Sequence, residues 1–184
     1  MSTLKEGHLL LKNGRLRYPK LFTPAPIKGD PSAKPRYSCV FYLPKSDTKT
    51  KEMIDAEIER LSKLHLNGKI PKASNLFIRD GDGEDGDSIT AGCWIISANR
   101  SESQKRPQVV DKDGRTPIDS QDTKLYAGCR VNILVDIYKP SGWDRICCGL
   151  EIVQWIGDDE PLGAGGVKAE DVMPNLEDED EDEI

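Results

Sequence analysis

Apolar and polar side chains alternate with a period of two along much of the chain, a pattern typical of half-buried β-strands. The alternation is clearest over residues 128–140, where Val131, Ile133, Val135 and Ile137 share one face. Further strands are predicted at residues 9–22, 36–44, 92–100 and 145–156, with a short hairpin at 108–118. The last long strand follows 128–140 after a short turn, so we expect these two to pair antiparallel.

Turn signals punctuate this pattern. Asn13-Gly14 is typical of tight turns, so the strand over 9–22 is expected to begin with a hairpin-like reversal. The short hairpin is expected to turn at Lys112-Asp113-Gly114. The proline-rich segment 24–35 and the acidic, glycine-rich segment 79–90 are predicted to be loops.

One segment has helical periodicity instead. Apolar residues at spacings of four, three and three predict an amphipathic helix of about 18 residues. The stripe consists of Ile54, Ile58, Leu61 and Leu64. Ser46 or Asp47 can cap the start of the helix, and Asn67-Gly68 can end it. Six or so strands with one helix predict a mainly β protein, a small β-barrel decorated by a helix, with a β-sandwich as the alternative.

Charge divides the chain into two parts. The whole sequence has a net charge of −6, but residues 1–157 hold 25 cationic against 20 acidic residues, a net charge of +5. We therefore predict a domain over 1–157 and an acidic, disordered tail over 158–184. The densest part of the tail is Glu177, Asp178, Glu179, Asp180, Glu181, Asp182 and Glu183. Such a run mimics a phosphate backbone, so it could compete with DNA for a basic groove.

Composition and motifs argue against several classes of protein. Five cysteines without CxxC spacing favour reduced, buried thiols in a cytoplasm-like compartment over a disulfide framework. His8 and His65 lack ligands at metal-binding spacing, and the Asp80–Asp87 loop departs from the calcium-loop pattern, so no metal or cofactor is predicted. Phosphate-loop, GxSxG and HExxH motifs are missing, so an enzyme is not expected. No apolar run reaches the ~18 residues of a membrane helix, and no signal-peptide core is evident.

Positive evidence points to nucleic acid. Arginines alternate with aromatic residues on the predicted exposed strand faces, and single-stranded DNA is held by cations on phosphates and aromatic rings on bases. The candidate DNA-binding residues are Arg15, Arg17, Arg36, Tyr42, Trp94, Arg100, Lys105, Arg106, Arg130 and Tyr138. The aromatic members could instead pack in the core, and for Trp94 the two interpretations are equally good.

The order of several segments resembles a known family. The segments are GRLRYPKLFTP, RYSCVFYLPKSD, VVDKDGRTPI, LYAGCRVNILVDIY and GLEIVQWIGDDEPLGAGG. Together they look like the single-stranded DNA-binding proteins of tailed bacteriophages. The resemblance implies an OB-fold-like five-stranded antiparallel barrel with extra hairpins and no catalytic residues. It also implies roles in phage DNA replication, recombination and repair in the cytoplasm of the infected bacterial host. The acidic tail would contact phage DNA polymerase or other replication proteins.

Two other interpretations remain open. A DNA-mimicking protein could use the acidic tail to inhibit a nucleic-acid enzyme, although such a mimic would need no basic groove. A metal-dependent nuclease could use the Asp80–Asp87 loop. The sequence leaves the oligomeric state undetermined, and a homodimer could form through an exposed edge strand.

Overall fold

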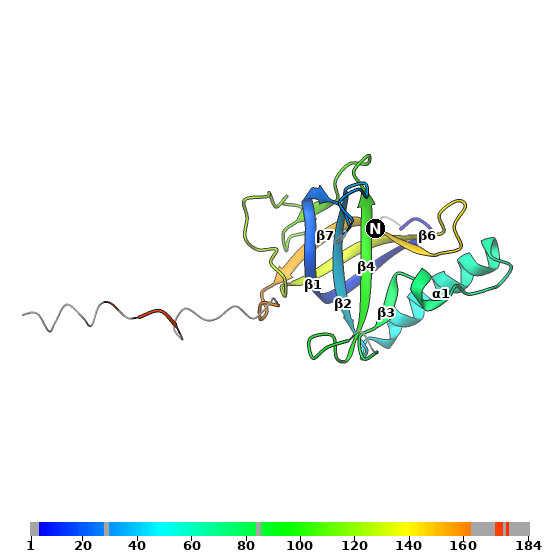
Figure 1. The fold of residues 1–184 in the computed structure, drawn as a ribbon, viewed down its shortest axis with the longest axis horizontal. Helices are drawn as coiled ribbons and strands as arrows, with labels where there is room; N and C mark the ends of the chain where they lie inside the picture. The colour runs from blue at the N-terminus through cyan, green and yellow to red at the C-terminus, as the bar shows by residue number, and fades with distance from the viewer. Residues whose placement is uncertain (1–3, 28–29, 84–85, 163–171, 175, 177–184) are drawn as a thin grey trace, which may run out of the picture.

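The computed structural model describes residues 4–27, 30–83, 86–162, 172–174 and 176. Seven strands form one sheet in the order β3-β4-β2-β1-β6-β7-β5, and a further pairing of β4 with β7 closes five of them into a barrel. Figure 1 shows the barrel with α1 beside β3. The strands are β1 (His8–Ala25), β2 (Arg36–Pro44), β3 (Ile78–Asp80), β4 (Cys93–Ser101), β5 (Gln108–Val110), β6 (Arg130–Tyr138) and β7 (Cys147–Gly157). The helices are α1 (Thr48–His65) and the 3₁₀ turn η1 (Ala73–Asn75).

The predicted mainly β barrel with one prominent helix is confirmed, with one refinement. The ring runs β1-β2-β4-β7-β6, and the closing pair, β4 with β7 at Asn99 and Gly149, is parallel. A closed ring with an odd number of strands cannot be antiparallel throughout, because strands of alternating direction must come in pairs. The short strands β3 and β5 extend the sheet outside the ring, on β4 and β7.

The hairpin expected at Asn13-Gly14 is wrong. Residues 8–25 form one continuous strand, which pairs with β6 through its first half and with β2 through its second. Asn13 and Gly14 lie at a register shift in the pairing with β6, and Asn13 has a φ of 55°. The ring of Phe41 lies against Gly14, so a Cβ at this position would come within 2.2 Å of it. Glycine therefore lets the strand bend over the core instead of reversing its direction.

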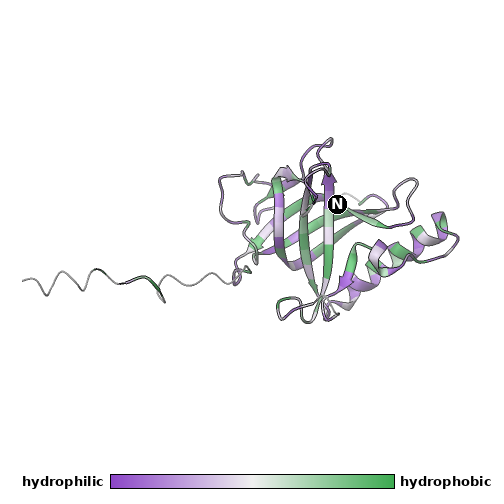
Figure 2. Ribbon diagram, in the orientation of Figure 1, coloured by the Kyte–Doolittle hydropathy of each residue, from purple (hydrophilic) through white to green (hydrophobic). Residues whose placement is uncertain are grey.

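The other predicted elements agree closely with the structure. The side chains of Val131, Ile133, Val135 and Ile137 on β6 are buried, as the alternation predicts. Strand β7 returns antiparallel to β6. The 108–118 segment does fold back on itself, with the Asp111 N–H donating to the Thr116 carbonyl at 2.8 Å. Figure 2 shows apolar and polar residues alternating along the strands.

Helix α1 packs its apolar stripe against the barrel core. Ile54, Ile58 and Leu61 are buried, whereas Leu64 is 64% exposed, so the predicted stripe ends one turn early. The Asp47 carboxylate accepts from the Thr50 N–H at 3.2 Å and caps the first turn, as expected. No helix in the described part of the chain is long and apolar enough to cross a membrane.

The five cysteines are free, as predicted, but differ in exposure. Cys39, Cys129 and Cys148 are buried in the core, and burial raises the pKa of Cys39 to about 12 and that of Cys129 to about 11. Cys93 and Cys147 are only partly buried. Since a thiolate is the reactive form, the three core thiols are chemically inert in the folded protein.

We predict that Gly14→Ala destabilises the fold by about 1–3 kcal/mol, because the added methyl group must displace Phe41 in a packed core. Gly157→Ala is the matched control, since nothing lies within 4 Å of a Cβ at that strand position. Urea unfolding measures both. Equal losses in the two variants would show that Gly14 has no special packing role.

Candidate nucleic-acid interface

A groove crosses the outward face of β2 and β4. Ser38 lies opposite Asn99, and Val40 lies opposite Ser97, so short side chains form the floor. The groove also includes Ile27 from the β1–β2 connection and residues of the β6–β7 turn. A sheet face flanked by these two connections is where OB-fold barrels bind oligonucleotides.

Three arginines from separate elements surround this groove. Arg36 begins β2, Arg79 lies in β3, and Arg145 lies in the turn before β7. Within the described residues, none of the three forms an ion pair. Their positive charges are therefore available to an anionic ligand, and guanidinium groups bind phosphate oxygens well.

Two exposed tyrosines line the same groove. The Tyr138 side chain is 43% exposed and Tyr18 is 59% exposed. Burial of part of the Tyr138 ring raises the pKa of its hydroxyl above the usual range. The Arg17 guanidinium lies 4.7 Å from the centre of the Tyr18 ring. The groove thus offers aromatic faces as well as cations.

Of the ten residues predicted to bind DNA, Arg36 and Tyr138 line the groove directly. Arg17 lies beside it, opposite Val40 in the pairing of β1 with β2. The Arg17 guanidinium donates to the Tyr42 hydroxyl oxygen at 2.9 Å. Tyr42 itself is only 4% exposed, so it presents no free ring face for stacking. Its position instead fixes Arg17 at the edge of the groove.

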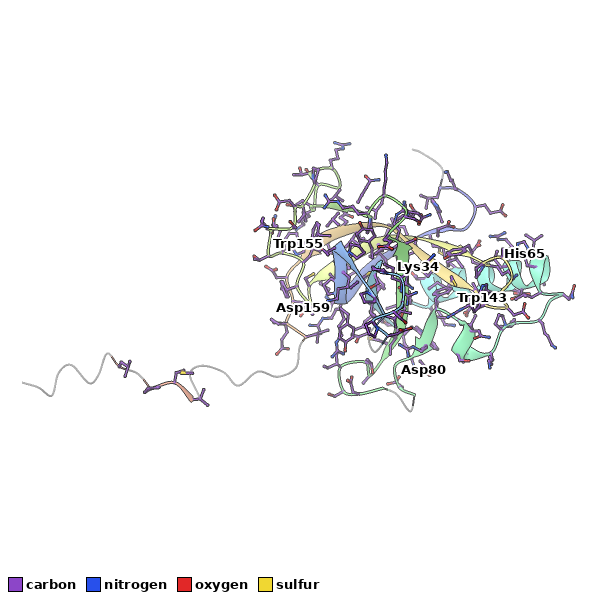
Figure 3. The ribbon with its side chains drawn as sticks, turned by 45° about the horizontal axis from the view of Figure 1, so that its top comes forward. Lys34, His65, Asp80, Trp143, Trp155 and Asp159 are labelled. Carbon is purple, nitrogen blue, oxygen red and sulfur yellow. The ribbon has the colours of Figure 1, made fainter. Side chains whose placement is uncertain are left out.

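Arg15 and Arg130 are engaged elsewhere. They lie opposite each other on β1 and β6, and both approach the Asp159 carboxylate, Arg130 Nε at 2.7 Å and Arg15 Nε at 3.6 Å. The Asp159 N–H also donates to the Tyr126 hydroxyl oxygen. We call Asp159 with its two arginines the C-terminal anchor. It holds the segment after β7 against one end of the barrel, far from α1 in Figure 3.

Trp94 and Arg100 share the parity of the buried residues Ile96 and Ala98 on β4, not that of the outward face. The Trp94 ring packs against the core, with the ammonium groups of Lys45 and Lys51 within 4.7 Å of its centre. This placement favours the core interpretation of Trp94.

The remaining predicted cations lie near the β4–β5 connection. Arg100 Nη1 is 3.1 Å from a Glu151 carboxylate oxygen, which compensates its charge. Lys105 and Arg106 are exposed in the loop after β4, and the Arg106 guanidinium lies 5.4 Å from the centre of the Phe22 ring. The acidic residues 177–183 predicted to compete with DNA lie outside the described residues.

Sequence reasoning missed Arg79, Arg145 and Tyr18. Strand β3 has only three residues, and Arg145 lies in a turn, so neither position has a periodicity that would reveal its face. The alternation places Tyr18 on the apolar face with Leu16. A positive φ of 49° and a register shift after Arg17 turn it outward instead. The Ser141-Gly142 turn signal, followed by Trp143 and Arg145, is the clue that the sequence offers.

The closed barrel and its groove define the class of OB-fold-like, nucleic-acid-binding domains. A sequence model of the family described as "Enterobacter phage Enc34, ssDNA-binding protein" matches residues 7–184. The chain belongs to this family, which confirms the resemblance to phage single-stranded DNA-binding proteins. A curated relative, "Putative protein p50" of Acyrthosiphon pisum secondary endosymbiont phage 1, is 30% identical and covers 95% of this chain and 96% of its own.

Solved structures agree with this assignment. The single-stranded DNA-binding protein of bacteriophage Enc34 is 33% identical, with a TM-score of 0.72 over 92% of each chain. Its complex with single-stranded DNA gives 32% identity and a TM-score of 0.73, covering 86% of this chain and 91% of that one. The gp2.5 protein of bacteriophage T7, at 13% identity and a TM-score of 0.55 over 89% of this chain and 98% of its own, shares the fold alone.

The C-terminal anchor predicts a pH dependence of stability. The Glu160 N–H and the two arginines hold the pKa of Asp159 below its usual range, so its ionised form stabilises the fold above the ordinary Asp pKa of about 3.9. This stabilisation disappears as the pH falls through the lower folded-state pKa. Asp159→Asn should therefore be less stable than the wild type at pH 7, and the difference should shrink below about pH 4.

Urea unfolding from pH 7 to pH 3 measures this difference. Asp144→Asn is the matched control, because Asp144 is exposed in the β6–β7 turn and, among the described residues, its carboxylate forms no ion pair. A deficit of Asp159→Asn that stays constant across this range would exclude the anchor as its cause.

Proposed function

We propose that this protein binds single-stranded DNA without sequence preference, in the groove across β2 and β4. The observation that carries the proposal is the set of exposed tyrosines and of arginines without an ion pair among the described residues that surrounds this groove, in a chain of the Enc34 family. The Enc34 relative has been solved in complex with single-stranded DNA, which supports the same ligand here.

The chemistry of the groove favours a single strand over a duplex. Arginines neutralise phosphates, and the rings of Tyr18 and Tyr138 can stack on bases only where the bases are unpaired. Neither contact reads a base edge, so binding is expected to tolerate any sequence. The protein would coat exposed strands instead of recognising a site.

The finer assignments extend this proposal. Coating of exposed strands serves DNA replication, recombination and repair, and in a phage protein these would take place in the cytoplasm of the infected host. The acidic residues 177–183 would compete with DNA for the arginines and would recruit replication proteins such as a phage DNA polymerase. A homodimer in which one tail reaches the groove of the other copy would use the same charges.

Tyr138→Ala is expected to weaken binding of oligo-dT by about 1–3 kcal/mol, the cost of losing one stacked base. Tyr138→Phe is the matched control, because it keeps the ring and should bind like the wild type. Fluorescence anisotropy of a labelled oligonucleotide at two salt concentrations measures both variants, with the matching duplex alongside. Unchanged affinity of Tyr138→Ala would remove this residue from the interface.

Deletion of residues 170–184, which hold nine acids and no Lys or Arg, should tighten DNA binding most at low salt. The matched control is a tail of the same length in which the nine acids are replaced by their amides. It should behave like the deletion, since charge and not length is the cause. If the protein with the amide tail instead binds DNA with the affinity of the wild type, competition by charge is excluded. Failure of both chains to bind any oligonucleotide would favour the DNA-mimic alternative.

A further inference from the structure

Three metal-ligating side chains meet where the start of β1, the end of β6 and the middle of β7 come together. His8 lies directly opposite Asp136 in the β1–β6 pairing, and Glu151 comes from the neighbouring strand β7. One ligand atom of each residue lies within 4.8 Å of the other two. Spacing along the sequence does not reveal this cluster, because the partners of His8 are more than 120 residues away along the chain.

The electrostatics of this cluster favour a cation. In the described part of the chain, the side chains of His8 and Asp136 form neither a hydrogen bond nor an ion pair. Asp136 is partly buried, and burial together with the nearby Glu151 carboxylate raises its pKa, while His8 opposes this shift. Two carboxylates that repel each other beside an imidazole can be stabilised together by one divalent ion.

We propose that His8, Asp136 and Glu151 form a binding site for a divalent transition metal of the Zn²⁺ class. Imidazole nitrogen and carboxylate oxygen are both zinc ligands, and three protein ligands leave the fourth position open. The ligand atoms need to move inward by small side-chain rotations, because zinc lies about 2.0–2.2 Å from each ligand. The three residues lie on adjacent paired strands, so their backbone positions are fixed by the barrel.

The cluster borders a hollow that adjoins the candidate DNA groove. Asp136 and Glu151 line a second hollow, and Arg36 and Tyr138 line both this hollow and the groove. Lys34 of the β1–β2 connection also lines the second hollow and is labelled in Figure 3. A phosphate oxygen of a bound strand could therefore take the open position in place of water.

Metal binding would also remove the charge compensation of Arg100, a step that rests on the proposed function. Glu151 now compensates Arg100 at 3.1 Å. A metal ion that takes the Glu151 carboxylate leaves the guanidinium uncompensated, while the carbonyl oxygens of Lys105 and Leu150 continue to hold it in place. Arg100 would then be free to neutralise a phosphate. Metal and DNA would each increase the affinity for the other.

Equilibrium dialysis of the full-length protein against Zn²⁺ tests the site without DNA. The wild type should bind one more tight Zn²⁺ than His8→Ala, Asp136→Asn or Glu151→Gln. The loss of affinity should be at least the ~10–100-fold typical of outer-shell partners. His65→Ala is the matched control, because His65 is the only other histidine and is exposed at the end of α1. The cysteines and the acidic tail are unchanged in all these variants, so they cannot account for a difference.

Thermal unfolding shows whether the ligand variants still fold, so that lost zinc binding is not mistaken for loss of structure. Zn²⁺ should raise the midpoint of the wild type and of His65→Ala but not that of the three ligand variants, whose metal-free midpoints should stay close to the wild type. Equal zinc binding and equal zinc stabilisation in His8→Ala and the wild type would overturn the proposed site. If His8→Ala fails to fold, Glu151→Gln provides the same comparison.

Oligo-dT binding with Zn²⁺ or with a chelator tests the coupling. Zn²⁺ should tighten binding by the wild type and steepen its salt dependence by about 0.7, the contribution of one additional phosphate contact to a single strand. Zn²⁺ should leave the oligo-dT affinity of His8→Ala and its salt dependence unchanged. Zinc binding without an effect on DNA affinity would overturn the coupling but not the site. Failure to bind DNA in either condition would overturn the proposed function while the dialysis result stands.

Discussion

Closure of five strands into a ring is the constraint on which the rest of the structure depends. In a closed ring every strand must pair on both of its edges. With five strands, one of the pairs must run parallel. The 18-residue strand β1 meets the first requirement only because it bends at Gly14, where the Phe41 ring occupies the space of a side chain. The parallel pair β4–β7 meets the second. It also brings Arg100 next to Glu151 and the β6–β7 turn next to the groove.

The sequence predicted the long, regular elements well, because their burial repeats with a fixed period. Strand β6 and helix α1 are examples. It failed at Asn13-Gly14, since a local turn signal does not reveal a ring packed on the glycine from 27 residues away. Strand parity placed Arg36 and Tyr138 on exposed strand faces, and both line the groove. The sequence did not reveal that Arg15, Arg100 and Arg130 form ion pairs. Their partners, Glu151 and Asp159, are remote from them in sequence.

Local compensation of charge divides the arginines of the basic surface into two groups. Net charge alone treats all arginines as equal, and the +5 of residues 1–157 could be spread over any face. In the fold, arginines at the barrel ends and seams are paired with carboxylates, whereas Arg36, Arg79 and Arg145 form no ion pair with any described residue. The arginines that hold the barrel together are thus separate from those that remain available to a ligand.

The distribution of cysteines has a practical consequence for following occupancy of the groove. Cys147 lines it and is partly accessible, whereas Cys39, Cys129 and Cys148 are buried. Cys93 is partly accessible too, at the opposite end of β4 from Ser101. The alkylation rate of Cys147 in the native protein would therefore report whether the groove is occupied, and the rate of Cys93 would serve as an internal reference. The three buried thiols would react only after unfolding.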